Sequence, residues 1–253
     1  MPWDPRRYHQ FQKERFAPFE DLLRLIKARS GLRVIDLGCG TGELTRRLAD
    51  HLPESDVVGL DASREMLEQA QGQARLGLRF QFGAIEDVDG EWDLVFSHAA
   101  LQWVADHRTL MPRLLSLLPV GGQLAVQVPS NFDHATYGEI RDLAGCEPFR
   151  DALNGWVNEF HVLPIREYAD LLHAHGAGEL NVFEKIYPHV LEDADAMAAW
   201  MQGTALVPYF DRLPKELHER FLRSYRERLR RRFPERPVFY GFNRTLIAAT
   251  RVQ

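Results

Sequence analysis

The sequence predicts an α/β protein with a seven-stranded, mostly parallel sheet, helices on both faces, and a helical cap inserted late in the chain. Three observations carry this prediction. Apolar segments alternate with amphipathic ones through the first half, a glycine-rich turn follows the first apolar segment, and the alternation stops after Pro129. Strands that alternate with helices at this spacing form parallel sheets covered on both faces.

The elements of the first half follow from their apolar spacing. An apolar stripe at 22–26 predicts a helix near the start of the chain. Leu44, Leu48 and Leu52 lie four residues apart, which predicts a helix that packs by one face. Ser63 is a suitable N-cap for the next helix. A further helix is expected at 110–118, and strands are expected at 32–37, 56–60, 79–83, 92–97 and 123–128.

The second half has fewer strands and more helices. Strands are expected only at 182–187 and 239–249. The helical cap is expected at about 131–175 and 194–235. We therefore divide the chain near residue 130, into a first part with the N-terminal helices and the ligand-binding half of the sheet, and a second part with the remaining strands and the cap.

Composition narrows the classes of protein. The chain has 253 residues, 45% of them hydrophobic, and a net charge of −5. A mildly acidic chain argues against a nucleic-acid or membrane-surface binder. No apolar run approaches the ~20 residues that cross a bilayer, and no secretory signal is visible. Two cysteines suggest a reducing compartment. We expect a cytoplasmic protein, a monomer or weak homodimer, with no metal site.

The glycine turn and an acidic residue after the next strand predict a nucleotide site. Gly38, Gly40 and Gly42 lie between a predicted strand and a helix, the arrangement of Rossmann-like folds. Glycines let the backbone turn sharply and let a ligand approach it closely. Asp61 ends the second strand, where a carboxylate can accept both ribose hydroxyls. Together these residues predict an adenosine-containing ligand.

Two acidic residues argue against a dinucleotide. The dinucleotide fingerprint needs a third glycine where this chain has Glu43, and an acid there competes with a pyrophosphate for the helix N-terminus. Asp36 can pair with a cationic ligand group. S-adenosylmethionine carries an ammonium and a sulfonium and no phosphate, so it suits this site. A nicotinamide dehydrogenase remains an alternative that Glu43 disfavours.

Three segments resemble the class I S-adenosylmethionine-dependent methyltransferases, namely 36–42, 59–67 and 93–97. This resemblance covers about residues 30–130. Further segments are similar to the trans-aconitate 2-methyltransferase family and extend the likeness to nearly the whole chain: 3–15, 101–107, 124–131 and 242–244.

The resemblance implies the residues of the site. Those expected to bind the cofactor are Arg15, Asp36, Gly38, Cys39, Gly40, Asp61, Ala62, Met66, Ala84, Ile85, Glu86 and Ser97. Those expected to contact the substrate are Tyr8, His98, Trp103, Asn131, Tyr240 and Arg244. Many relatives have an Asp where this chain has Ala84, so the adenine contact falls to the Ile85 backbone or to Glu86. For the side chain of Cys39 we expect a packed thiol rather than a reactive one, and Trp103 either lines the pocket or fills the core.

The implied activity is methylation of a small polycarboxylic acid, with S-adenosylhomocysteine as the second product. A carboxylate is already ionised at neutral pH, so no catalytic acid or base is required. A methyltransferase for the free carboxylate of a malonyl-thioester is the alternative enzyme. A methyltransferase-like module that binds the cofactor without chemistry is an alternative of another class.

Overall fold

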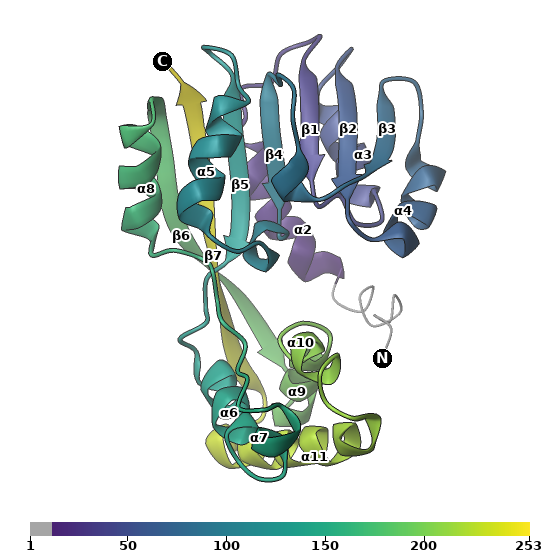
Figure 1. Cartoon of the computed structure of the whole chain (residues 1–253), viewed down its shortest axis with the longest axis vertical. Coiled ribbons are helices and arrows are strands. Elements are labelled where there is room, and N and C mark those ends of the chain that lie inside the picture. The colour runs from purple at the N-terminus through teal and green to yellow at the C-terminus, as the bar shows by residue number, and fades with distance from the viewer. Residues whose placement is uncertain (1–11) are drawn as a thin grey trace. The chain divides into compact units, whose positions relative to one another are not determined.

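A computed structural model describes the backbone of residues 12–253 and the side chains of residues 16–253. The described chain forms two compact units (Figure 1). The sheet unit comprises 16–130, 161–185 and 243–253, and the helical unit comprises 131–160 and 186–242. Two long strands, β6 (Ala177–Leu191) and β7 (Val238–Arg251), contribute residues to both units. The first predicted segment of the cap, 131–175, is therefore divided between the units. Residues 131–160 belong to the helical unit, whereas 161–175 belong to the sheet unit.

The sheet has seven strands in the order β3-β2-β1-β4-β5-β7-β6. The bounds of the first five are β1 Arg33–Leu37, β2 Asp56–Asp61, β3 Leu78–Phe82, β4 Leu94–His98 and β5 Gln123–Pro129. These five strands pair in parallel, and β7 pairs with β5 in antiparallel fashion. The predicted seven-stranded, mostly parallel sheet is confirmed. The strand order reverses between β1 and β4, and open α/β sheets bind ligands beyond the carboxyl ends of the strands at such a point.

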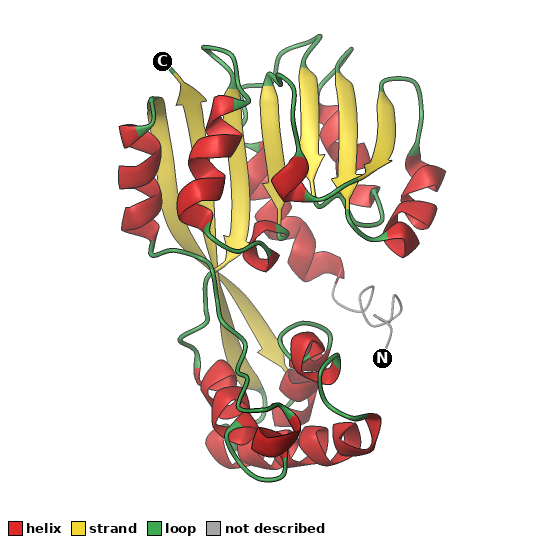
Figure 2. Cartoon of the chain, viewed as in Figure 1, coloured by secondary structure: helices red, strands yellow, loops and turns green. Residues whose placement is uncertain are grey.

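Helices cover both faces of this sheet (Figures 1 and 2). The helices of the sheet unit are α2 Gln12–Leu23, α3 Glu43–His51, α4 Arg64–Ala70, α5 His107–Ser116 and α8 Ile165–Ala174. Successive side chains of β1 point to opposite faces of the sheet, which explains why helices pack on both faces. Val34 packs with Phe19 and Leu48 of α2 and α3, whereas Ile35 packs with Leu110 of α5 and its neighbours on the other face. Full burial of each such side chain stabilises the fold by about 1.5–3 kcal/mol.

The helical unit is built around one apolar cluster. Its helices are α6 Ala135–Ala144, α7 Phe149–Ala152, α9 Ala194–Gln202, α10 Val207–Phe210 and α11 Lys215–Arg232. Met197 and Met201 lie one turn apart on α9, and both are buried with Phe221 and Tyr225 of α11. This helical spacing is the reason that α9 and α11 pack by one face each.

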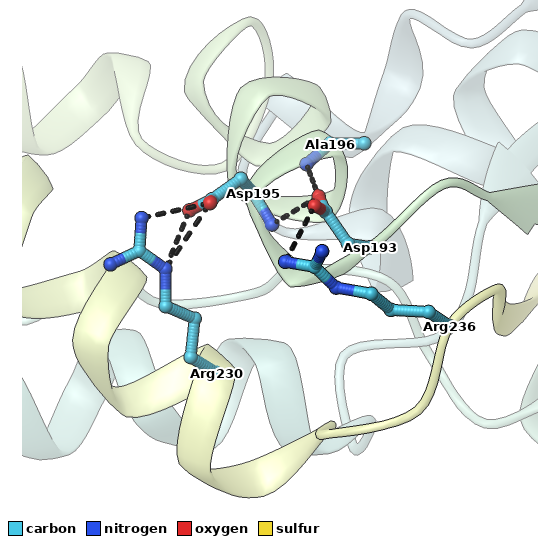
Figure 3. A network of polar contacts seen from close by, with 5 residues as sticks. All are labelled: Asp193, Asp195, Ala196, Arg230 and Arg236. Carbon is cyan, nitrogen blue, oxygen red and sulfur yellow. Dashed lines mark hydrogen bonds and ion pairs between the residues drawn. The ribbon is translucent and has the colours of Figure 1, made fainter.

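A polar network fixes the start of α9 (Figure 3). The carboxylate of Asp193 accepts the backbone N–H groups of Asp195 and Ala196 at 2.9 and 3.0 Å, and these bonds, that of Ala196 first, lower its pKa. Arg236 pairs with Asp193 at 3.2 Å, and Arg230 of α11 binds both oxygens of Asp195. Asp193 is therefore an N-cap, and the two arginines join α9 to the end of α11 and the segment before β7.

The described residues contain neither a membrane-spanning helix nor a metal-binding group of side chains. Within residues 12–253, no helix is both long enough and apolar enough to span a bilayer. No three His, Cys, Asp or Glu side chains of that part of the chain are grouped so as to hold a metal ion.

Candidate functional site

The glycine turn joins the end of β1 to the start of α3. The backbone N–H groups of Gly38 and Cys39 both donate to the carbonyl of Leu60, at 2.8 and 3.0 Å, which fastens the turn to β2. Gly38 has φ +80°, and a Cβ there would lie 2.1 Å from that of Ala100. Gly40 has φ +56°, and a Cβ there would have no described heavy atom within 4 Å. Gly38 is thus required for packing, and Gly40 leaves backbone open to a ligand.

Asp61 connects this turn to the residues that follow β2. One carboxylate oxygen accepts the backbone N–H of Gly40 and the other accepts that of Ser63, each at 2.8 Å. Ser63 in turn caps α4, because its hydroxyl accepts the N–H of Met66 at 3.3 Å. Each carboxylate oxygen has a second lone pair. Asp61 can therefore hold the turn and still accept a hydrogen bond from a ligand.

Asp36 supplies a second, deeply buried carboxylate. Its side chain is 3% exposed and accepts a hydrogen bond from the Thr45 hydroxyl at 2.6 Å. Burial raises the pKa of Asp36 to about 7, the Thr45 bond opposes this rise, and the charge of Asp61 adds to it. A cation beside this carboxylate would favour its ionised form. The pair Asp36 and Asp61 thus suits a ligand with a positive group.

Cys39 is a packed thiol. It is buried in a small cluster with Leu67 and Ala70 of α4. Burial, and then the charges of Asp36 and Asp61, raise the pKa of the thiol far above its usual range. The side chain of Cys39 is therefore protonated at neutral pH and is not a nucleophile.

Further predicted cofactor residues follow the ends of β2 and β3. Ala62 is exposed between Asp61 and α4, and Met66 is half-buried on α4. Ala84 precedes a single 3₁₀ turn, η2 (Ile85–Asp87), and the Ile85 side chain reaches within 3.9 Å of the position that a Gly38 Cβ would take. Glu86, on the same turn, is exposed.

The end of β4 carries Ser97 and His98. Ser97 is fully buried, and its hydroxyl donates to the Leu37 carbonyl at 2.8 Å, which holds the end of β1 against β4. The His98 ring meets Phe19 of α2 edge to face, with centroids 5.6 Å apart. Trp103 lies on the next 3₁₀ turn, η3 (Leu101–Trp103), and is 59% exposed, so it does not fill the core.

A buried pair that the sequence did not single out fixes η3. His107 Nε2 donates to the Leu101 carbonyl at 2.8 Å, so its Nδ1 accepts the Tyr168 hydroxyl proton, at 2.5 Å. The Tyr168 oxygen also accepts the N–H of Leu163. Burial lowers the pKa of His107, which keeps the ring neutral for this role. The turn that carries Trp103 is thereby joined to α5 and α8.

The predicted substrate residues are divided between the units. Arg244 is a buried residue of β7 in the sheet unit, in register with Pro129 at the end of β5. Asn131 and Tyr240 belong to the helical unit and are brought together there, because the Asn131 amide donates to the Tyr240 hydroxyl at 3.0 Å.

Two of the predicted residues lie near the start of the chain. Tyr8 lies outside the described residues, and Arg15 lies in the first turns of α2, where the structure describes only the backbone.

Comparisons with known proteins agree with this geometry. A family model described as a methyltransferase domain matches residues 28–169. The chain is 44% identical over 257 residues to a trans-aconitate 2-methyltransferase from Deinococcus radiodurans, with 99% of each chain covered. It has the fold of the YcgJ protein from Bacillus subtilis, with a TM-score of 0.63, 15% identity, and coverage of 94% and 99%. It also has the fold of a Haemonchus contortus phosphoethanolamine N-methyltransferase 2 bound to S-adenosyl-L-methionine, with a TM-score of 0.56, 15% identity, and coverage of 94% and 53%.

Proposed function

Because the chain belongs to the trans-aconitate 2-methyltransferase family of S-adenosylmethionine-dependent methyltransferases, we propose that it methylates a carboxylate of trans-aconitate. The products are the monomethyl ester and S-adenosylhomocysteine. The observation that carries this proposal is the extent of the similarity, which covers 99% of this chain and of its relative. It therefore includes the helical segments as well as the sheet.

The residues at the glycine turn fit S-adenosylmethionine. The open backbone at Gly40 admits a ligand, and the carboxylates of Asp36 and Asp61 suit its ammonium group and its ribose hydroxyls respectively. Glu43 in the first turn of α3 would repel a pyrophosphate. When bound, the cofactor supplies a methyl group on a positively charged sulfur. The further cofactor contacts that we propose are Arg15, Gly38, Cys39, Ala62, Met66, Ala84, Ile85, Glu86 and Ser97.

For this reaction the protein must align the acceptor carboxylate with the methyl group and exclude water from both. A carboxylate oxygen of the substrate attacks the methyl carbon, the new O–C bond forms as the C–S bond breaks, and the electron pair stays on sulfur. The carboxylate needs no base, because it is ionised at neutral pH. Opposite charges are neutralised in this step, so a dry site favours it, and alignment alone can lower the barrier by about 7–11 kcal/mol.

The carboxylates that do not react need donors to hold them. Arg244 is the strongest candidate, because guanidinium groups bind carboxylates through two hydrogen bonds. His98, Trp103, Asn131, Tyr240 and Tyr8 are the further substrate contacts that we propose. None of these residues is assigned an acid or base role.

The test is release of S-adenosylhomocysteine over a panel of small acids. We expect turnover with trans-aconitate and weaker turnover with dicarboxylates. A malonyl-thioester is included, and activity on it alone would favour the second enzyme class. Activity on a phenol or an amine and on no carboxylate would overturn the proposal. Tight binding of S-adenosylmethionine without turnover of any acceptor would favour a binding module.

A further inference from the structure

Two glutamines on β5 differ in how their side chains are bonded. Gln123, at the start of the strand, accepts the Lys27 N–H at 2.8 Å and donates to the Lys27 carbonyl at 3.1 Å. Gln127, four residues later, is 0% exposed, and neither atom of its amide has a hydrogen-bond partner among the described residues. Both side chains lie on the same face of the strand, because alternate residues of a strand share a face.

An unbonded, buried amide opposes folding. Removing such a group from water costs free energy that a hydrogen bond would otherwise offset. The residues that share a face with Gln127, Ala125 on β5 and Leu246 in register on β7, are apolar, so an apolar residue would pack at this position without that penalty. A group of this kind calls for an explanation other than stability.

Strand register places Gln127 in a polar row at the ligand edge of the sheet. His98 of β4 is in register with Gln127, and Gln127 is in register with Leu246 of β7. Arg244 lies two residues before Leu246 on β7. Residues in register or two apart share a face. His98, Gln127 and Arg244 therefore lie on one face of three neighbouring strands, close to the carboxyl ends of β4 and β5. It is the α2 face, because the adjacent Phe96, Ala125 and Leu246 belong to the cluster that contains Phe19.

The chemistry of this row fits a carboxylate. An amide offers two N–H donors, and the guanidinium of Arg244 adds a positive charge on the same face. The cofactor carboxylates Asp36 and Asp61 are on β1 and β2, whereas β5 lies two strands away from β1, at about 4.8 Å per strand. Gln127 and Arg244 are thus set apart along the sheet from the carboxylates that suit the cofactor.

We propose that Gln127 determines acceptor specificity, by donating an amide N–H to a carboxylate of the acceptor that is not methylated. A hydrogen bond to the attacking oxygen would lower its nucleophilicity, so the bonded group is one of the spectators. Binding of the acceptor also satisfies the buried amide. This inference rests on the proposed function, since it takes the acceptor to be a polycarboxylate.

The test compares Gln127→Met with Gln123→Met. Methionine keeps the length of the side chain and removes the donors. For Gln127→Met we expect the KM for trans-aconitate to rise about tenfold to a hundredfold, with a smaller change in kcat, and the melting temperature to stay or rise. The Kd for S-adenosylmethionine, measured by calorimetry, should not change. For Gln123→Met we expect a lower melting temperature and unchanged constants for both substrates.

The other outcomes distinguish a failure of the proposed function from a failure of the role proposed for Gln127. If the wild-type protein methylates no carboxylate, the proposed function fails and this inference fails with it. If the wild-type protein is active and Gln127→Met keeps the wild-type KM for trans-aconitate, only the inference fails. A parallel loss of cofactor affinity would assign Gln127 to the cofactor. A melting temperature of Gln127→Met below that of Gln123→Met would make Gln127 a structural residue.

Discussion

The carboxylate of Asp61 accepts the backbone N–H of Gly40 at 2.8 Å, so the turn after β1 is held by the residue that ends β2. The sequence identifies Asp61 as a residue for the ribose of the ligand. The structure adds a second role, because the same side chain shapes the turn against which the ligand lies. Substitutions at Asp61 therefore act on the ligand both directly and through the backbone of Gly40.

For Asp61→Asn we expect both a loss of affinity and a loss of stability. An amide has one acceptor oxygen, so one of the two backbone N–H groups, that of Gly40 or that of Ser63, would face an NH₂ group. Hydrogen bonds to charged groups contribute about 1.5–3 kcal/mol each. Calorimetry with S-adenosylmethionine and urea denaturation measure the two effects. Asp56→Asn, at the other end of β2 and exposed in an ion pair with Arg79, is the control and should leave affinity unchanged.

Cofactor affinity should rise with pH through neutrality because of Asp36. The pKa of this carboxyl is raised to about 7 without a cation beside it, and an ammonium group would lower that pKa on binding. Below the raised pKa, binding must release a proton, so affinity weakens about tenfold per pH unit in the limit. Calorimetry between about pH 6 and pH 8, in buffers of different ionisation enthalpy, measures both affinity and proton release.

Asp36→Asn is the matched variant for this pH effect. It should bind S-adenosylmethionine weakly, with no dependence on pH in that window. Its cofactor-free form should be more stable than the wild-type protein at high pH. A folded pKa above the unfolded value of 3.8 means that the wild-type protein loses stability as pH rises from that value to about 7. Identical pH profiles for the variant and the wild-type protein would contradict this role.

Alanine at Gly40 and at Gly38 should give different defects. Gly40→Ala places a methyl group in open space, so it should cost about 1–2 kcal/mol for the left-handed backbone and also reduce cofactor affinity. Gly38→Ala should be far more destabilising, because its methyl group would overlap Ala100. Gly31→Ala is the control, since Gly31 has φ +73° and equally open surroundings away from the site. Equal affinities for Gly31→Ala and Gly40→Ala would show that the ligand does not approach Gly40.

Tyr240→Phe tests the pair in the helical unit. Removing the hydroxyl leaves the buried Asn131 amide without this acceptor, so we expect a loss of stability of about 1–3 kcal/mol and, if the pair binds the acceptor, a higher KM for trans-aconitate. Tyr225→Phe is the control, because the buried Tyr225 hydroxyl donates to the Thr136 carbonyl in the same unit. A KM that rises equally in both variants would assign the effect to the fold.

Sequence predicted the parts of the site that depend on neighbouring residues. The turn at Gly38–Gly42 and the cap at Ser63 are local, and both are found where they were expected. The two late strands are longer than predicted, and β7 runs over Val238–Arg251. Its length could not be predicted locally, because its partner strand β5 lies more than a hundred positions earlier in the chain. The pairing of Ser97 with Leu37 and the bond states of Gln123 and Gln127 likewise depend on partners that no local pattern reveals. The sequence does contain one indication for Gln127, because it is a polar residue between two valines in a predicted strand.

The His107 and Tyr168 pair has a consequence for how mutational scans of this protein are interpreted. Tyr168 is on α8, and the turn it secures through His107 precedes it by more than sixty residues. A change at Tyr168 would displace the indole of Trp103 without removing any group that a substrate could touch. Substitutions at Tyr168 would therefore lower activity in a screen, although Tyr168 has a structural role. The screen would suggest a second functional site on α8, whereas α8 only stabilises the distant turn η3.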